Sequence, residues 1–325
     1  SFGPLGAKGF AFLNMLQLIG WTSIMIYDAM LALQELAPLS PMIWTIGIGA
    51  LVILWLFIGL HNTGYIQAIV SVLLLGLTLY MGAHMISQWP NEASLLTSGN
   101  MSFIAALELS IAMPLSWLPL ISDYTRESKK PFSASLTSAI VYTVTSIVMY
   151  TLGLSAAIFG GGDSIITIMM NAGLGLAGLI VIIFSTVTTT FMDAYSAGVS
   201  STTIYKSASS KGIAVVVTIV GTIAAILYPM DDITDFLYLI GSVFTPMIAI
   251  LLADYFINRQ QVQTISAYLV RGLICVVSVG LYHYMLHSES TIGATLPAFT
   301  TAFFVTAIVG FISHTENSSV EIKQH

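Results

Sequence analysis

Apolar residues fill this chain in long runs, and short polar or glycine- and proline-containing segments separate one run from the next. A run of about 20 apolar residues is long enough for an α-helix to cross the hydrocarbon core of a bilayer. The pattern therefore predicts an all-α polytopic membrane protein with ten membrane-spanning helices. The predicted helices cover residues 11–36, 42–60, 65–88, 101–122, 133–159, 173–203, 212–229, 234–257, 264–286 and 291–313. The predicted breaks include Pro38, the segment 61–64, Pro90 and the glycines at 160–162.

The composition agrees with this interpretation and excludes several other classes of protein. Of the 325 residues, 56% are hydrophobic and 7% are charged, whereas soluble domains contain about 25% charged residues. The net charge of −6 is spread over the loops, which excludes a nucleic-acid-binding face. The single cysteine, Cys275, excludes an internal disulfide. The sequence contains neither a metal-ligand spacing nor a nucleotide-binding loop, so we expect no cofactor.

The lysines and arginines predict the orientation of the chain in the membrane. They lie at alternate connections or at the ends that flank them: Lys8; Arg126, Lys129 and Lys130; Lys206 and Lys211; Arg259 and Arg271; and Lys323. An even number of predicted crossings separates each group from the next, so one orientation places all of them in the cytoplasm, as the positive-inside rule requires. We therefore expect both termini of this chain to be cytoplasmic.

A carboxylate occupies the middle of the sixth predicted helix. Asp193 lies within an apolar run, where an acid costs roughly 2.5–3.5 kcal/mol on insertion scales. Hydroxyl side chains at helical spacing surround it: Thr186, Thr189, Thr190, Ser196 and Ser200. Such a polar stripe inside a membrane helix indicates a transporter with a small-molecule site near the bilayer midplane.

The first predicted helix carries a second polar stripe. Asn14, Gln17, Trp21, Met25 and Asp28 follow one another at offsets that trace one helical face. Interhelical hydrogen bonding is one explanation, because it is common in membrane bundles. The other is a substrate site, in which the mid-span indole of Trp21 stacks on a planar ligand.

The fourth and eighth predicted helices contain further polar and helix-breaking residues. Pro114 and Pro119 flank Ser116 and Trp117 and predict an interrupted helix, which is typical of sites in secondary transporters. The other explanation is a simple proline kink. Glu108, in the outer half of the fourth helix, is either a proton carrier or a gate residue. Near the end of the eighth helix, Asp254 lies close to Arg259, which favours a structural role at the interface.

Three stretches together resemble the nucleobase–cation symporter-1 family, which includes the cytosine permeases and the sodium–hydantoin transporter. They are LNMLQLIGWTSIMIYDAM, LSWLPLISDYTRESKKP and TTTFMDAYSAGVS, and FTPMIAILLADYF also fits. The resemblance covers essentially the whole chain and points to the hydroxymethylpyrimidine permease branch. It implies the leucine-transporter-type fold, with two inverted five-helix repeats and two extra helices.

The resemblance also implies a division of the single transporter domain. Residues 1–90 correspond to the remainder of the first repeat, 101–258 to the second repeat, 264–313 to the extra helices and 314–325 to a cytoplasmic tail. The family's first two helices have no counterpart here, and the chain starts without methionine. We therefore expect it to be a fragment that lacks those two helices.

Site residues follow from the resemblance position by position. Trp21 falls on the stacking tryptophan of the family's third helix, and Met25 falls where the hydantoin carrier has a substrate-bonding glutamine. Asp193 takes the place of a substrate-binding asparagine. Thr188 lies where a hydroxyl ligand of sodium is found, whereas Val187 replaces a second hydroxyl. The expected substrate-binding residues are Trp21, Met25, Pro114, Ser116, Trp117 and Asp193, and the expected ion-coupling residues are Glu108, Thr188 and Thr189.

The carboxylate at Asp193 predicts the class of substrate. An ionised carboxylate accepts hydrogen bonds and donates none, so it suits a 4-aminopyrimidine better than an oxo-ring. We therefore predict an importer of hydroxymethylpyrimidine in the bacterial cytoplasmic membrane, coupled to Na⁺ or H⁺. A cytosine or other nucleobase permease is the alternative within transporters. A channel, an inactive fragment or an intramembrane enzyme would be alternatives of another class, and the scattered acids do not favour the enzyme.

Overall fold

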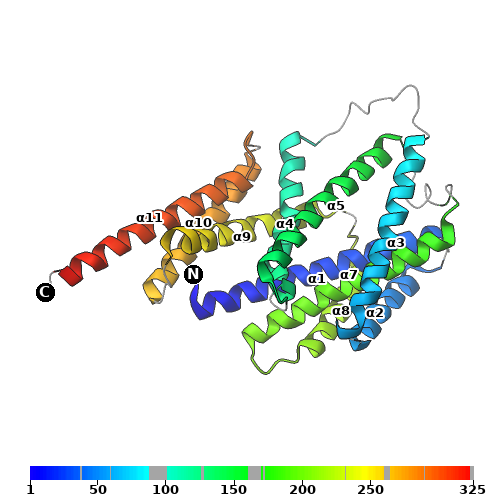
Figure 1. Ribbon diagram of the computed structural model, residues 1–325, viewed down its shortest axis with the longest axis horizontal. Helices are drawn as coiled ribbons and strands as arrows, with labels where there is room; N and C mark the ends of the chain where they lie inside the picture. Colours follow the sequence, from blue (N-terminus) through cyan, green and yellow to red (C-terminus); the bar gives the residue numbers. More distant parts are fainter. Residues whose placement is uncertain are drawn as a thin grey trace. The chain divides into compact units, whose positions relative to one another are not determined.

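The computed structural model describes all residues except 37–38, 59, 88–100, 126–127, 160–169, 171–172, 231, 260–263, 289 and 323–325. The described part is helical (Figure 1). Its elements are α1 (Gly3–Leu36), α2 (Pro41–Ile58), α3 (Leu60–Ser87), α4 (Phe103–Thr125), α5 (Pro131–Phe159), α7 (Gly175–Ile204), α8 (Ser210–Leu227), α9 (Thr234–Leu252), the π-helix η1 (Ala253–Asn258), α10 (Ile265–His287) and α11 (Thr295–Ile322). Within these residues, ten helices are long and apolar enough to cross a membrane, which confirms the predicted number.

Two predicted helix breaks are wrong. The segment 61–64 belongs to the first turns of α3, because α2 ends at Ile58 and α3 begins at Leu60. Helix α4 continues through both Pro114 and Pro119, so it is not interrupted. Each proline removes only one backbone donor, and membrane helices tolerate this loss where neighbouring groups satisfy the freed carbonyls.

Two other helix ends differ from the prediction by about two turns. Helix α1 already begins at Gly3, and α11 continues to Ile322, so most of the predicted tail is helical. Several predicted features lie outside the described residues: Pro38, Pro90, the glycines at 160–162, Arg126 and Lys323.

The chain forms two compact units, and two helices contribute to both. The first unit contains Ser1–Leu13, Asn100–Pro119 and Ile233–His325, and the second contains Asn14–Gly99 and Leu120–Asp232. The boundary therefore passes through α1 after Leu13 and through α4 after Pro119. Asp193 and Trp21 belong to the second unit, whereas Glu108 and Trp117 belong to the first.

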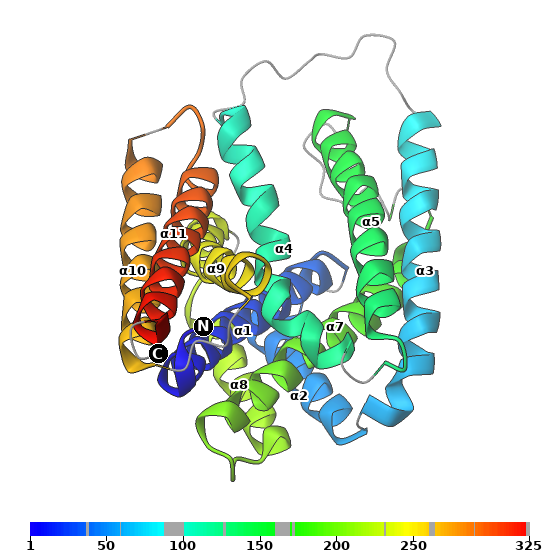
Figure 2. The same cartoon turned by 60° about the vertical axis from the view of Figure 1, so that its left-hand side comes forward.

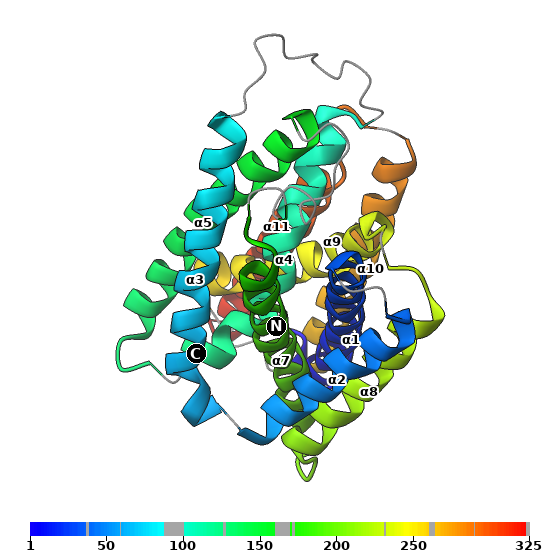
Figure 3. The same cartoon turned by 90° about the vertical axis from the view of Figure 1, so that its right-hand side faces the viewer.

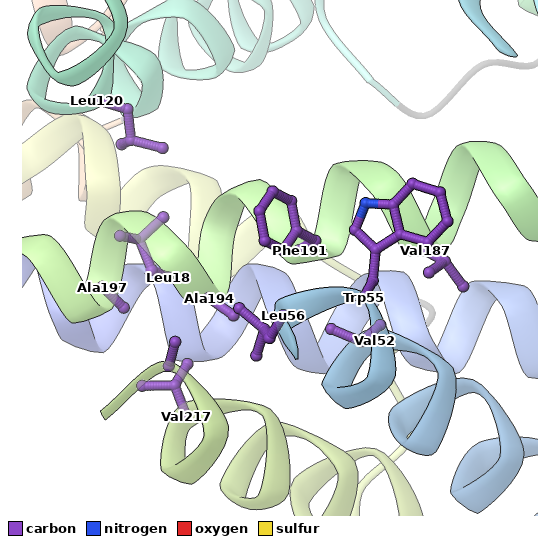
Figure 4. Packing of buried hydrophobic residues seen from close by; sticks show 11 residues of the cluster. Leu18, Val52, Trp55, Leu56, Leu120, Val187, Phe191, Ala194, Ala197 and Val217 are labelled. Atoms are coloured by element: carbon purple, nitrogen blue, oxygen red, sulfur yellow. The ribbon is translucent and has the colours of Figure 1, made fainter. Parts of the chain in front are cut away.

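In the second unit, α1, α2, α7 and α8 pack around an apolar core (Figures 3 and 4). The core residues are Leu18, Val52, Trp55, Leu56, Leu120, Val187, Phe191, Ala194, Ala197, Ala214 and Val217. A neighbouring cluster joins Ile26, Ala29 and Leu33 of α1 to Ile48 and Ala225. Helix α3 packs against α5 and α7 on another side of this unit (Figure 3). The core thus buries one face of α7, which also carries the buried hydroxyl of Thr190.

In the first unit, α9, α10 and α11 pack together (Figure 2). A buried ion pair connects the end of α9 to α10: Arg271 donates to Asp254 from Nε at 3.0 Å and from Nη2 at 2.9 Å. Asn258 donates to the same carboxylate at 2.8 Å and to the Thr306 carbonyl of α11 at 3.2 Å. The basic partner of Asp254 is thus Arg271 rather than the neighbouring Arg259, which follows the π-helical turn in a left-handed conformation with an exposed side chain.

Candidate functional site

Asp193 lies on α7 with only 6% of its surface exposed. Its neighbours Phe191, Ala194 and Ala197 belong to the apolar core of the second unit. Within the described residues, no side chain or backbone N–H donates a hydrogen bond to the Asp193 carboxylate. A buried acid without a partner is costly in a low-dielectric interior. The arrangement therefore fits a carboxylate whose partner is a ligand or a proton.

A hydrogen bond defines the level at which α1 meets α7. Asn14 Nδ2 donates to Ser200 Oγ at 2.8 Å. The helices are antiparallel, because Leu18 packs in one cluster with Ala194 and Ala197, and Ile183 packs on the cluster that contains Ile26. Counting the same number of residues forward from Asn14 on α1 and backward from Ser200 on α7 therefore reaches two residues at about the same height along the pair of helices.

This register places the predicted residues of α1 and α7 at common levels. Trp21 lies seven residues after Asn14, and Asp193 lies seven residues before Ser200. Met25 and Thr189 lie at equal steps of eleven residues. Both Trp21 and Met25 are half-buried, whereas Asp28, further along the stripe, is exposed. An indole face and a carboxylate at one level are suited to a flat heterocycle that carries a polar edge.

The predicted ion-coupling threonines lie one turn from Asp193. Thr188 is 3% exposed, and its hydroxyl donates to the carbonyl of Phe184 at 2.8 Å and of Ser185 at 3.0 Å. Thr189 donates to the carbonyl of Ser185 at 2.9 Å. Because both hydroxyl protons point into their own helix, both oxygen atoms keep lone pairs that are able to accept from a proton donor or contact a cation.

The predicted residues of α4 belong to the first unit. Ser116 is 3% exposed and donates to the Met113 carbonyl at 2.6 Å. Trp117 is half-buried, and Pro114 is exposed. The roles predicted for these three residues stay predictions.

Glu108 makes a contact that the sequence pattern did not indicate. Its carboxylate accepts hydrogen bonds from the backbone N–H of Ala294 at 3.1 Å and of Thr295 at 3.0 Å, and also from the Thr295 hydroxyl. It therefore caps the amino end of α11, where a negative charge is favourable. Gly293 has a φ of +76°, and a Cβ there would lie 2.2 Å from Glu108 Oε1, so the tight approach requires glycine. Gly293 lies inside the predicted helix 291–313, whereas α11 begins at Thr295, so the predicted start of this helix is wrong by four residues.

The sequence matches the model of a family described as "Permease for cytosine/purines, uracil, thiamine, allantoin" over residues 46–318. The chain belongs to this permease family. The predicted family is thus confirmed, and the permease is a multi-pass membrane transport protein rather than an enzyme. No curated protein sequence matches the permease.

A solved structure supports the fold of the permease. It is described as the structure of Mhp1, a nucleobase-cation-symport-1 family transporter, in a closed conformation with bromovinylhydantoin bound. The TM-score is 0.73 at 17% sequence identity, and the match covers 94% of the permease and 76% of that chain. The permease therefore has the leucine-transporter-type fold that the sequence predicted.

Proposed function

We propose that the permease imports hydroxymethylpyrimidine, or a closely related 4-aminopyrimidine, by cation symport with alternating access. The observation that carries this proposal is the buried Asp193 carboxylate without a hydrogen-bond donor among the described residues. The exocyclic amine of a 4-aminopyrimidine supplies such a donor. If the adjacent ring nitrogen is protonated, it supplies a second, and the pair matches the two carboxylate oxygens with charge assistance.

Cytosine is the alternative substrate, and the family description supports considering it. Cytosine also carries a 4-amino group, but it has a ring carbonyl where hydroxymethylpyrimidine has a methyl group. That carbonyl would approach the same site as an acceptor. Uracil and hydantoin lack the amine, and they fit an amide side chain better than the carboxylate of Asp193.

Counterflow in proteoliposomes tests the proposed function. Vesicles that contain the permease are loaded with unlabelled hydroxymethylpyrimidine, and labelled hydroxymethylpyrimidine is added outside. We expect transient, saturable accumulation of label that unlabelled cytosine inhibits more strongly than uracil does. Counterflow of uracil with none of hydroxymethylpyrimidine or cytosine would contradict the proposal. Flux without saturation would indicate a channel, and a complete lack of flux would contradict the proposed transport activity.

Trp21 is expected to stack on the substrate ring. Its half-buried indole lies at the level of Asp193, and stacking contributes roughly 0.5–1.5 kcal/mol beyond area burial. Trp21→Ala should therefore weaken binding by about tenfold, and Trp21→Phe by less. Trp44→Ala removes another half-buried indole in the same unit and is the matched control, with an expected effect on stability but not on substrate affinity. Unchanged substrate affinity in Trp21→Ala would show that the indole packs against the protein and does not stack on the substrate.

We propose that the coupling ion is H⁺ rather than Na⁺. Two observations support this choice: Val187 occupies a position where a second hydroxyl was expected, and Asp193 is a buried acid that is suited to carrying a proton. Uptake is measured with a pH gradient and a Na⁺ gradient imposed separately. We expect the pH gradient to drive accumulation that a protonophore abolishes. Accumulation driven by Na⁺ alone and insensitive to the protonophore would reject this proposal.

We place the permease in the bacterial cytoplasmic membrane with both chain ends on the cytoplasmic side. The distribution of Lys8, Lys129, Lys206 and Lys211 at alternate connections supports this orientation.

A further inference from the structure

Three polar side chains link α1 to α7 two turns away from the candidate substrate site. Gln17 Nε2 donates to Asn14 Oδ1 at 2.7 Å, and Asn14 Nδ2 donates to Ser200 Oγ at 2.8 Å. Asn14 and Gln17 are each only 4% exposed. This network, consisting of Asn14, Gln17 and Ser200, connects residues 186 positions apart in the sequence.

The apolar contacts between α1 and α7 are poorly suited to fixing the axial position of one helix against the other. Leu18 packs with the small residues Ala194 and Ala197 (Figure 4). Such contacts set the distance between two helices, but small side chains such as alanine interlock less deeply than large ones and add no directional bond. A hydrogen bond between two side chains weakens steeply when its length or angle changes. The network therefore adds a directional constraint on the register of these two helices.

The axial position of α1 relative to α7 determines whether Trp21 and Asp193 can contact the same ligand. One helical turn corresponds to 5.4 Å of rise, whereas a binding site needs its groups held within about 0.5 Å of the productive geometry. A slip of α1 by a single turn would bring Gln17 or Met25, instead of the indole, to the level of Asp193.

We propose that Asn14 and Ser200, supported by Gln17, are positioning residues that hold Trp21 and Asp193 at one level for substrate binding. This inference rests on the proposed function of the site. The three residues of the network are not proposed to contact the substrate themselves. Its effect appears in affinity, because a misplaced indole and carboxylate no longer engage one planar ligand together.

A kinetic comparison separates positioning from general stability. Ser200→Ala removes the acceptor of the Asn14 amide and is expected to raise the KM for hydroxymethylpyrimidine roughly threefold to tenfold, with Vmax per correctly folded molecule unchanged. The exchange variant Asn14→Ser with Ser200→Asn restores a donor and an acceptor across the same gap and should recover most of the affinity. Ser201→Ala is the matched control, because the Ser201 hydroxyl is buried and donates only to the Gly198 carbonyl of its own helix in the described contacts.

Each kinetic outcome decides the proposal. An unchanged KM in Ser200→Ala, or an equal rise in Ser201→Ala, would overturn it. A loss of Vmax without a change in KM would also overturn it, because it would indicate a defect in folding or in the transport cycle.

A second measurement does not depend on the substrate. Spin labels are attached at Leu31→Cys on α1 and Ile180→Cys on α7, two exposed positions near one level, in a Cys275→Ala background. We expect one narrow distance distribution with the native network and a broader or shifted one in Asn14→Leu. An unchanged distribution would overturn the positioning role even if transport is normal. If the labels shift but hydroxymethylpyrimidine is not transported, the proposed substrate is wrong while the positioning role stands.

Discussion

Replacement of Asp193 by asparagine is expected to weaken hydroxymethylpyrimidine binding by roughly 10- to 150-fold, because hydrogen bonds to a charged group contribute about 1.5–3 kcal/mol. The amide has almost the same shape but accepts through one oxygen and donates through its nitrogen. It should therefore bind oxo-pyrimidines such as uracil better than the native protein does. The measurement is competition of unlabelled pyrimidines against labelled hydroxymethylpyrimidine in counterflow.

The control for this substitution is Asp235→Asn, which makes the same chemical change at an exposed residue in the first turn of α9. We expect its substrate preference to equal that of the native protein. If Asp193→Asn keeps the native order of preference at matched expression, then the carboxylate does not select the substrate.

Arg271→Ala is expected to cause the largest loss of stability among single substitutions in the first unit. It leaves the Asp254 carboxylate buried without its bidentate partner, and such a loss costs about 3–5 kcal/mol. The side chains of Arg271 and Asp254 are only 4% and 6% exposed, so water does not replace the lost partner. The measurement is thermal unfolding of the purified protein in detergent, monitored as the decrease of its monodisperse peak in size-exclusion chromatography.

Two variants distinguish the ion pair from a general effect of removing arginine. Arg259→Gln removes an exposed charge at the end of η1 and should leave the unfolding temperature nearly unchanged. Replacing both partners, in Asp254→Leu with Arg271→Met, should restore much of the stability, because no unpaired charge remains. If Arg271→Ala and Arg259→Gln unfold at the same temperature, the buried ion pair does not contribute the expected stability.

The number of membrane helices and the location of the polar stripes follow from the sequence, because both depend on local periodicity. Runs of apolar residues longer than a bilayer's thickness leave few alternatives to a membrane helix. Asp193 stands out for the same reason, since an acid in such a run requires an explanation. Trp21 and Met25 are half-buried, and their roles in the site stay predictions.

The partners of the buried charges do not follow from local spacing. Asp254 appeared closest to Arg259 along the chain, yet it pairs with Arg271 across two helices. Glu108 lies 187 positions from Thr295, whose backbone it caps. Such pairs depend on how helices cross, which is set by many small contacts that periodicity does not encode. In helix α4, local sequence predicted too much: its two prolines predicted an interrupted helix, but the helix is continuous.

The buried Asp193 carboxylate, which accepts no hydrogen bond from the described residues, has an electrical consequence. Under the proposed coupling to H⁺, the site loaded with a proton or a cationic substrate would be neutral, whereas the empty and ionised site would carry one negative charge within the membrane field. A full charge that crosses 100 mV changes the free energy by about 2.3 kcal/mol. We infer that a membrane potential that is negative inside pulls the empty site toward the outer face and leaves the loaded site almost unaffected. The voltage would then accelerate the return of the empty carrier, which is the step that an importer must complete before it binds again.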